Sequence, residues 1–151
     1  MLPHIHLILG IMIVNFLELN DLSSFFIILG SILPDLDLIL GILWKRNHRT
    51  FISHYPLIWL SLSLIFVFLS LEIYWLFVAG FIHLLVDVID WEVYLLRPVT
   101  NFKWSLFSLD PFVILQGKTF REKILLYYQN RKIICTELIV FGMFFLSISL
   151  S

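Results

Sequence analysis

The sequence is poor in charged residues and in cysteine. Only 14% of its 151 residues are charged, and the formal net charge at pH 7 is −1. A nucleic-acid-binding domain typically carries a strongly basic face, so nucleic acid is not expected as a partner. The single cysteine, Cys135, excludes an internal disulfide and a site built from several thiolates, and it leaves the redox compartment undetermined.

Several motifs of well-known enzyme classes are also missing. The chain has no GxSxG, no Walker loop and no HExxH, so nucleophilic-serine, P-loop and zincin chemistry have no support. The first six residues lack the basic region and small-residue cleavage site of a signal peptide. The first apolar segment is therefore expected to be retained.

What the chain has in excess is apolar surface. Hydrophobic residues make up 60% of it, including 15 phenylalanines, and the mean hydropathy is +0.98. A single domain of this length cannot bury so much apolar surface in its core and still cover itself with polar groups. We therefore expect an all-α, multi-pass membrane protein in which residues 1–151 form one membrane-embedded helical domain.

Five apolar segments are predicted as helices: Ile5–Leu17, Leu22–Trp44, Pro56–Leu71, Ile73–Val88 and Ile133–Leu150. The second is interrupted by Pro34-Asp35-Leu36-Asp37. About 20 residues are needed to cross the hydrocarbon layer, so only the second segment is long enough alone and the others need tilt or flanking residues.

The basic residues predict an orientation. All ten Lys and Arg fall in two stretches, Lys45–Arg49 and Arg97–Lys132, which five crossings place on one face. By the positive-inside rule this face is cytoplasmic, with the N-terminus inside and the C-terminus outside the cell membrane. Residues 118–132 predict a basic amphipathic helix, which lies on the inner leaflet in contact with membrane lipids or packs on its own protein.

Histidines and aspartates gather at one depth of this topology. Ionisable side chains within membrane segments are costly and are functional candidates by default. The candidate metal ligands are His6, Asp35, Asp37, His48, His54, His83 and Asp87, with His4 as a substitute for His6.

The spacing of two pairs supports a metal site. His83 and Asp87 are four residues apart and share one helix face. Asp35 and Asp37 would diverge on a helix, but Pro34 predicts an extended turn that directs both carboxylates the same way. A divalent cation between the carboxylates would remove their repulsion.

Imidazole and carboxylate ligands suit zinc, iron, manganese or nickel, with zinc the leading choice. Seven ligands are too many for one tetrahedral site and about right for two ions with open positions for water. One or two divalent transition-metal ions are therefore expected as cofactors.

Four sequence blocks, taken together, form a familiar pattern. They are Gly30-Ser-Ile-Leu-Pro-Asp-Leu-Asp37, Asn47-His-Arg-Thr-Phe-Ile-Ser-His54, Gly80-Phe-Ile-His-Leu-Leu-Val-Asp87 and Leu95-Leu-Arg-Pro98. Their order resembles the family of membrane-bound metal-dependent hydrolases typified by the LexA-regulated inner-membrane protein YdjM. His6 and Gly10 resemble the family's opening residues. The spacing from His48 to His54, one residue longer than usual there, is similar to a sibling family of uncharacterised membrane metal-binding proteins.

Both relatives imply metal binding, and the first implies hydrolysis. A distant similarity to the all-helical zinc phospholipases C implies a phosphodiester or lipid-like substrate. In this interpretation Arg49 clamps an anionic head group or serves the topology alone, and Asp90 orients a ligand, accepts a proton or is merely an exposed helix-end charge. The alternatives are a metal transporter or sensor without catalysis and an assembly subunit with a structural metal. The sequence leaves the oligomeric state open.

Overall fold

The protein is described from a computed structural model. The structure describes residues 3–37, 51–69, 71–89, 92–106, 122, 125 and 128–150. His48, Arg49, Asp90 and most of the predicted 118–132 helix lie outside this part of the chain.

Within the described residues the fold is all-helical and has no β-strand beyond one isolated bridge between Val93 and Trp104. The α-helices are α1 (Pro3–Leu17), α2 (Asp21–Ile32), α4 (Pro56–Phe68), α5 (Tyr74–Asp87) and α8 (Arg131–Leu150). Two 3₁₀ turns, η1 (Leu33–Leu36) and η3 (Ile52–His54), follow α2 and precede α4. All five predicted apolar segments therefore contain a helix.

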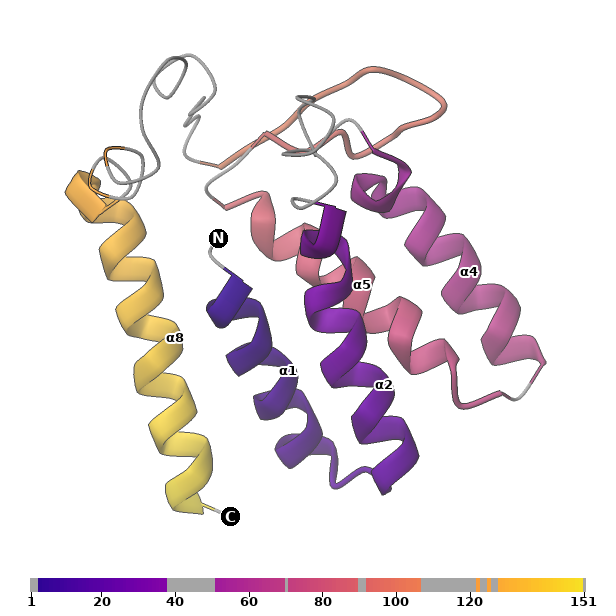
Figure 1. The fold of residues 1–151 in the computed structure, drawn as a ribbon, viewed down its shortest axis with the longest axis horizontal. Coiled ribbons are helices and arrows are strands. Elements are labelled where there is room, and N and C mark those ends of the chain that lie inside the picture. Colours follow the sequence, from indigo (N-terminus) through magenta and orange to yellow (C-terminus); the bar gives the residue numbers. More distant parts are fainter. Residues whose placement is uncertain are drawn as a thin grey trace.

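The helices pack side by side in the spatial order α8, α1, α2, α5, α4 (Figure 1). The end of α2, the end of α5 and the starts of α1 and α4 lie together at one end of the bundle, where η1 and η3 also lie. Local chemistry sets several of these boundaries. Asn20 accepts a hydrogen bond from the Ser23 backbone N–H and caps α2, whereas proline opens α1 and α4.

Glycines allow the central helices to approach closely. A Cβ on Gly30 of α2 would lie 2.2 Å from the Leu76 carbonyl oxygen of α5. A Cβ on Gly80 of α5 would lie 2.1 Å from the indole ring of Trp59 in α4. Small residues at such positions let helix backbones pack tightly in membranes. Trp59, Leu76 and Leu84 form a buried cluster at this contact.

The structure corrects the prediction for the second segment. The α-helix α2 has 12 residues and ends at Ile32, which gives a length of about 18 Å against the ~30 Å hydrocarbon layer. Among the described residues only α8, over Arg131–Ser149, is long and apolar enough to cross a membrane by itself. The apolar helices α1, α4 and α5 are shorter.

The Pro34 turn also differs from the prediction. Leu33 is helical, with φ −59° and ψ −40°, and Pro34 lies in the first turn of a 3₁₀ helix rather than in an extended segment. Proline fits there because the first N–H groups of a helix have no partner within it. With about three residues per turn, Asp35 and Asp37 diverge and meet different histidines.

Candidate metal centre

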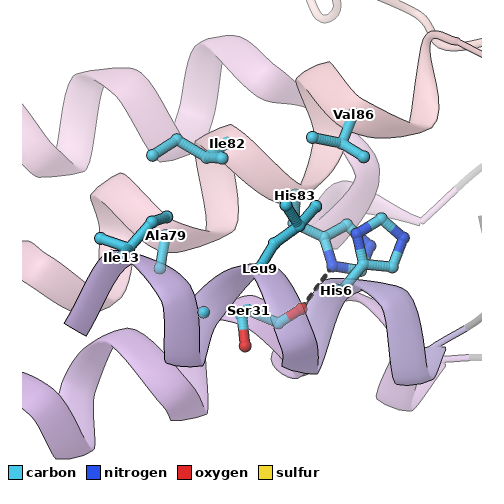
Figure 2. A pocket seen from close by; sticks show the side chains of 9 residues that line it. His6, Leu9, Ile13, Ser31, Ala79, Ile82, His83 and Val86 are labelled. Atoms are coloured by element: carbon cyan, nitrogen blue, oxygen red, sulfur yellow. Dashed lines mark hydrogen bonds between the residues drawn. The ribbon is translucent and has the colours of Figure 1, made fainter. Parts of the chain in front are cut away.

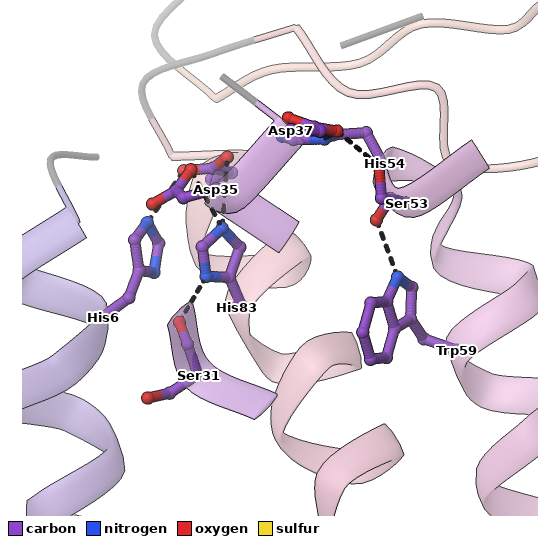
Figure 3. Close-up of polar contacts among 9 residues, drawn as sticks. His6, Ser31, Asp35, Asp37, Ser53, His54, Trp59 and His83 are labelled. Carbon is purple, nitrogen blue, oxygen red and sulfur yellow. Dashed lines mark hydrogen bonds and ion pairs between the residues drawn. The ribbon is translucent and has the colours of Figure 1, made fainter. Parts of the chain in front are cut away.

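The buried histidines and aspartates of the described chain meet at the end of the bundle where α2 and α5 finish. All of these are at most 5% exposed: His6 in α1, His83 and Asp87 in α5, Asp37 directly after η1 and His54 at the end of η3. Figure 3 shows the His6 and His83 rings below Asp35, with Asp37 and His54 at the side of the group. Residues from four separate parts of the chain therefore form one cluster.

Two overlapping sets of side chains have the spacing of metal ligands. His6, His83 and Asp87 each offer a ligand atom within 4.8 Å of the others, and so do Asp35, His54 and Asp87. Atoms that share one zinc ion lie about 4 Å apart or less, so the observed spacing is close to that of a metal site. Asp87 belongs to both sets, so its two carboxylate oxygens can serve two neighbouring ions.

His83 presents one particular nitrogen to this cluster. Its Nδ1 atom donates a hydrogen bond of 2.6 Å to the Ser31 carbonyl oxygen, which can only accept. In the neutral imidazole the lone pair is therefore on Nε2, which lies 3.6 Å from Asp35 Oδ1 and 3.9 Å from Asp87 Oδ2. A backbone partner of this kind commonly fixes the tautomer of a metal-binding histidine.

His54 is oriented in the same way by a carboxylate. Its Nδ1 atom lies 2.8 Å from Asp37 Oδ2, and the Ser53 hydroxyl donates to the same oxygen. The Trp59 indole N–H donates to the Ser53 carbonyl at 2.7 Å and ties η3 to α4. Because Nδ1 is bound to Asp37, Nε2 is the nitrogen of His54 that would bind a metal.

Asp37 lies in neither set of three. Its Oδ2 atom holds His54 and Ser53, while its Oδ1 atom is buried and has no hydrogen-bond partner within the described chain. The described geometry thus gives Asp37 the task of orienting His54. Its predicted role as a ligand stays a prediction.

His6 rather than His4 faces the cluster. The His6 Nε2 atom lies 3.1 Å from Asp87 Oδ1, and the His6 and His83 rings stack with centroids 3.6 Å apart. His4 is exposed on α1, with its ring 6.1 Å from that of Phe141 in α8. Of the two histidines, only His6 meets the other predicted ligands.

Several buried polar atoms of the cluster still lack a partner in the described part of the chain. They are His6 Nδ1, His83 Nε2, Asp35 Oδ2 and Asp37 Oδ1. A buried polar atom without a hydrogen bond is costly, and this donor set of imidazoles and carboxylates is one that transition-metal ions satisfy. The residues present therefore fit a divalent metal ion.

An apolar pocket lies beside the two stacked histidines, between α1, α2 and α5 (Figure 2). Besides His6, His83 and Ser31 it is lined mainly by apolar side chains: Leu9, Ile13, Ala79, Ile82 and Val86. One side of the two histidines therefore faces mainly apolar side chains. Electrostatic interactions at the cluster are strengthened as a result.

The sequence analysis did not identify the residues that support the ligands. Ser31, Ser53 and Trp59 hold His83 and the η3 turn through their backbone or side-chain groups. Ser31 and Ser53 lie inside the quoted blocks, which was the available signal. Their contacts depend on helix packing that the sequence pattern does not show.

Within the described residues the protein is all-helical, with a buried histidine–carboxylate cluster that could hold a metal ion. The family model described as YdjM inner membrane protein matches residues 1–151. The chain belongs to the YdjM inner membrane protein family, which supports its association with a membrane. Neither a curated protein nor a solved structure matches the chain.

Proposed function

We propose that this protein is a membrane-bound metal-dependent hydrolase that acts on a phosphodiester or lipid-like substrate. The observation that carries the proposal is the pair of ligand sets that share Asp87. Two sites joined by one carboxylate are typical of metal centres that act on phosphate esters, with ions about 3.5–4 Å apart. Zinc is the leading choice of metal, with manganese and iron as alternatives.

At such a centre some residues would bind the ions and others would orient the ligands. His6 and His83 would hold one ion, Asp35 and His54 the other, and Asp87 both. Asp37 and the Ser31 carbonyl keep two of the imidazoles in the ligand tautomer. Bound divalent cations supply Lewis acidity and bring the ionisation of water toward neutral pH.

We further propose that the protein is multi-pass and that the metal end faces the cytoplasm. The described basic residues Arg97, Lys103, Arg131 and Lys132 lie between α5 and the first turn of α8, at the end that carries the cluster. The opposite end has no Lys or Arg among the described residues, and the charged residues in or beside its turns are the acidic Glu18, Asp21 and Glu72. This division agrees with a cytoplasmic metal end.

A second candidate function is metal binding without catalysis. The burial of His6, His83 and Asp87, each at most 2% exposed, favours this alternative because a closed site suits a structural ion. Asp35, whose side chain is 15% exposed, is the more accessible member of the cluster. Access for substrate is therefore expected on the Asp35 side.

Elemental analysis of the detergent-purified full chain tests the metal, and a chromogenic phosphodiester tests the chemistry. One to two equivalents of a transition metal are expected, with hydrolysis that EDTA abolishes and added Zn²⁺ or Mn²⁺ restores. Asp87→Asn should lose both metal and hydrolysis, whereas Leu60→Asn on α4, away from the cluster, should keep them. Absence of metal after careful purification and reloading would refute the proposal. Metal without hydrolysis of any tested ester would favour the second candidate.

A further inference from the structure

Arg97 is a cation that the metal cluster does not use. It lies in the segment 92–106 that follows α5, and its side chain is half-buried. Its Nη1 atom donates to the Tyr55 hydroxyl at 3.1 Å, and its Nε atom donates to Asn101 Oδ1 at 3.0 Å. Only two of the five guanidinium N–H groups are engaged by these bonds.

Two aromatic rings hold the guanidinium in place. Its central carbon lies 3.9 Å from the ring centroid of Tyr94 and 5.3 Å from that of Tyr55. Stacking on tyrosine is favourable for arginine and restricts its side chain. Arg97 is therefore pre-oriented, with further N–H donors available.

The segment that carries Arg97 is attached at two points to residues that adjoin members of the metal cluster in the sequence. Leu106 N–H donates to the carbonyl of Val88, the residue after Asp87, at 2.7 Å. Tyr55, which receives the Arg97 hydrogen bond, directly follows His54. Figure 1 shows this segment running across the end of the bundle where η1 and η3 lie. Arg97 is thereby tied to the neighbour of His54, and the far end of its segment is tied to the neighbour of Asp87.

The charge of Arg97 has no carboxylate partner among the described residues. A second cation of the described segment, Lys103, lies 5.1 Å from the Tyr94 ring centroid and forms an ion pair of 3.3 Å with Glu92. Burial lowers the pKa of Lys103, but its hydrogen bonds to Glu92 and Tyr94 raise it more. Lys103 is therefore charged and balanced, whereas Arg97 is charged and unbalanced within the described chain.

We propose that Arg97 binds the phosphate oxygens of the substrate beside the metal centre, and that Tyr55, Tyr94 and Asn101 position it for this task. The proposal rests on the proposed hydrolase function. Arginine suits it because its planar fork matches two oxygens of a phosphate group at once. The phosphate belongs to a lipid head group or to a water-soluble phosphodiester, and both share the same recognition chemistry.

Binding of inorganic phosphate to the detergent-purified full chain, measured by calorimetry with and without bound Zn²⁺, tests the proposal. Arg97→Gln is expected to weaken phosphate binding about tenfold or more at unchanged metal content. Lys103→Gln removes a cation at the same tyrosine, and Arg131→Gln removes one from the start of α8. Both controls should bind phosphate within about twofold of the wild type.

Tyr55→Phe is the second variant, because it keeps the ring and removes only the hydroxyl that fixes Arg97. It should weaken phosphate binding several-fold and leave helix content unchanged, so it remains informative if Arg97→Gln fails to fold. Equal phosphate affinity of wild type, Arg97→Gln and Tyr55→Phe would overturn the proposal. So would a wild type that does not bind phosphate in either metal state.

Competition against phosphate distinguishes the two sources. A short-chain phosphatidylglycerol that competes better than glycerol phosphate would indicate a lipid head group, and equal competition would indicate a soluble ester. Either result supports phosphate recognition if it depends on Arg97. Arg97-dependent phosphate binding in a chain that holds no metal would refute the hydrolase and leave the role of Arg97 standing. Metal-dependent hydrolysis that is unaffected in Arg97→Gln would refute the role of Arg97 and leave the hydrolase function standing.

Discussion

The Nδ1 atom of His83 donates a 2.6 Å hydrogen bond to the carbonyl oxygen of Ser31, 52 residues earlier in the chain. Ser31 is in the last turn of α2 and His83 is in the last two turns of α5. This bond exists because Gly30 lets the two helices approach closely. The packing of two helices thereby decides which nitrogen of His83 faces Asp35 and Asp87.

Replacement of Asp37 by Asn should weaken metal binding without removing a member of either ligand set. The amide no longer accepts the His54 N–H as strongly as the carboxylate does, so affinity should fall by roughly 10–100-fold. The metal affinity is measured by competition with a fluorescent chelator. Glu72→Gln, which makes the same change at the far end of the bundle, should have no effect. An Asp37→Asn variant that binds metal as tightly as the wild type would show that Asp37 does not orient His54.

Metal stoichiometry should reveal whether Asp87 joins two ions. Asp87→Asn should reduce binding at both positions, whereas His6→Ala should affect only the set that contains His6. Metal per chain is measured after dialysis against a weak chelator. His4→Ala is the matched control, because His4 is exposed two residues away on the same helix. Complete loss of metal in both His6→Ala and His54→Ala would indicate one ion instead of two.

Gly80→Ala should destabilise the protein by about 1–3 kcal/mol or more, because the added methyl overlaps the Trp59 ring. Gly142→Ala in α8 is the control, since nothing lies within 4 Å of its added Cβ. In an exposed helix interior this control change is expected to be neutral or stabilising by up to about 1 kcal/mol. Thermal unfolding in detergent compares the two variants. Equal midpoints would contradict the close contact between α4 and α5.

Labelling with a membrane-impermeant thiol reagent should separate the two ends of the bundle. In a Cys135→Ser background, Lys103→Cys and Lys132→Cys should react only from the cytoplasmic side. Leu71→Cys, exposed between α4 and α5, should react only from outside. The physical reason is that loops rich in Lys and Arg stay on the cytoplasmic side of the membrane. Labelling of the two lysine positions from opposite sides would break the proposed topology.

Removal of metal by EDTA should leave the helices folded. Core contacts such as Ile5 with Val140 and the Trp59 cluster do not involve the ligands. Circular dichroism should therefore show unchanged helix content, with a lower melting temperature because bound ions stabilise by mass action, about 2.7 kcal/mol at 100 times Kd. Unfolding on chelation would identify the ion as a structural one.

The sequence by itself determined the helical class, the positions of five helices and the residue types of the site. Apolar runs broken by prolines and short polar turns are compatible with few other folds. Buried His and Asp side chains are costly, so their presence in apolar segments marks them as candidate site residues. The i,i+4 spacing of His83 and Asp87 also follows from helix geometry alone. These features depend on neighbours in the chain, which is why sequence periodicity contains them.

The tertiary structure decided how those residues are used. The turn at Pro34 is a 3₁₀ helix rather than an extended segment, so Asp35 faces His83 while Asp37 holds His54. The choice of His6 over His4, the Ser31 bond to His83 and the hydrogen bond from Arg97 to Tyr55 likewise arise from contacts between distant segments. Such contacts are set by how closely helices pack, through residues such as Gly30 and Gly80, and a linear pattern does not record that distance.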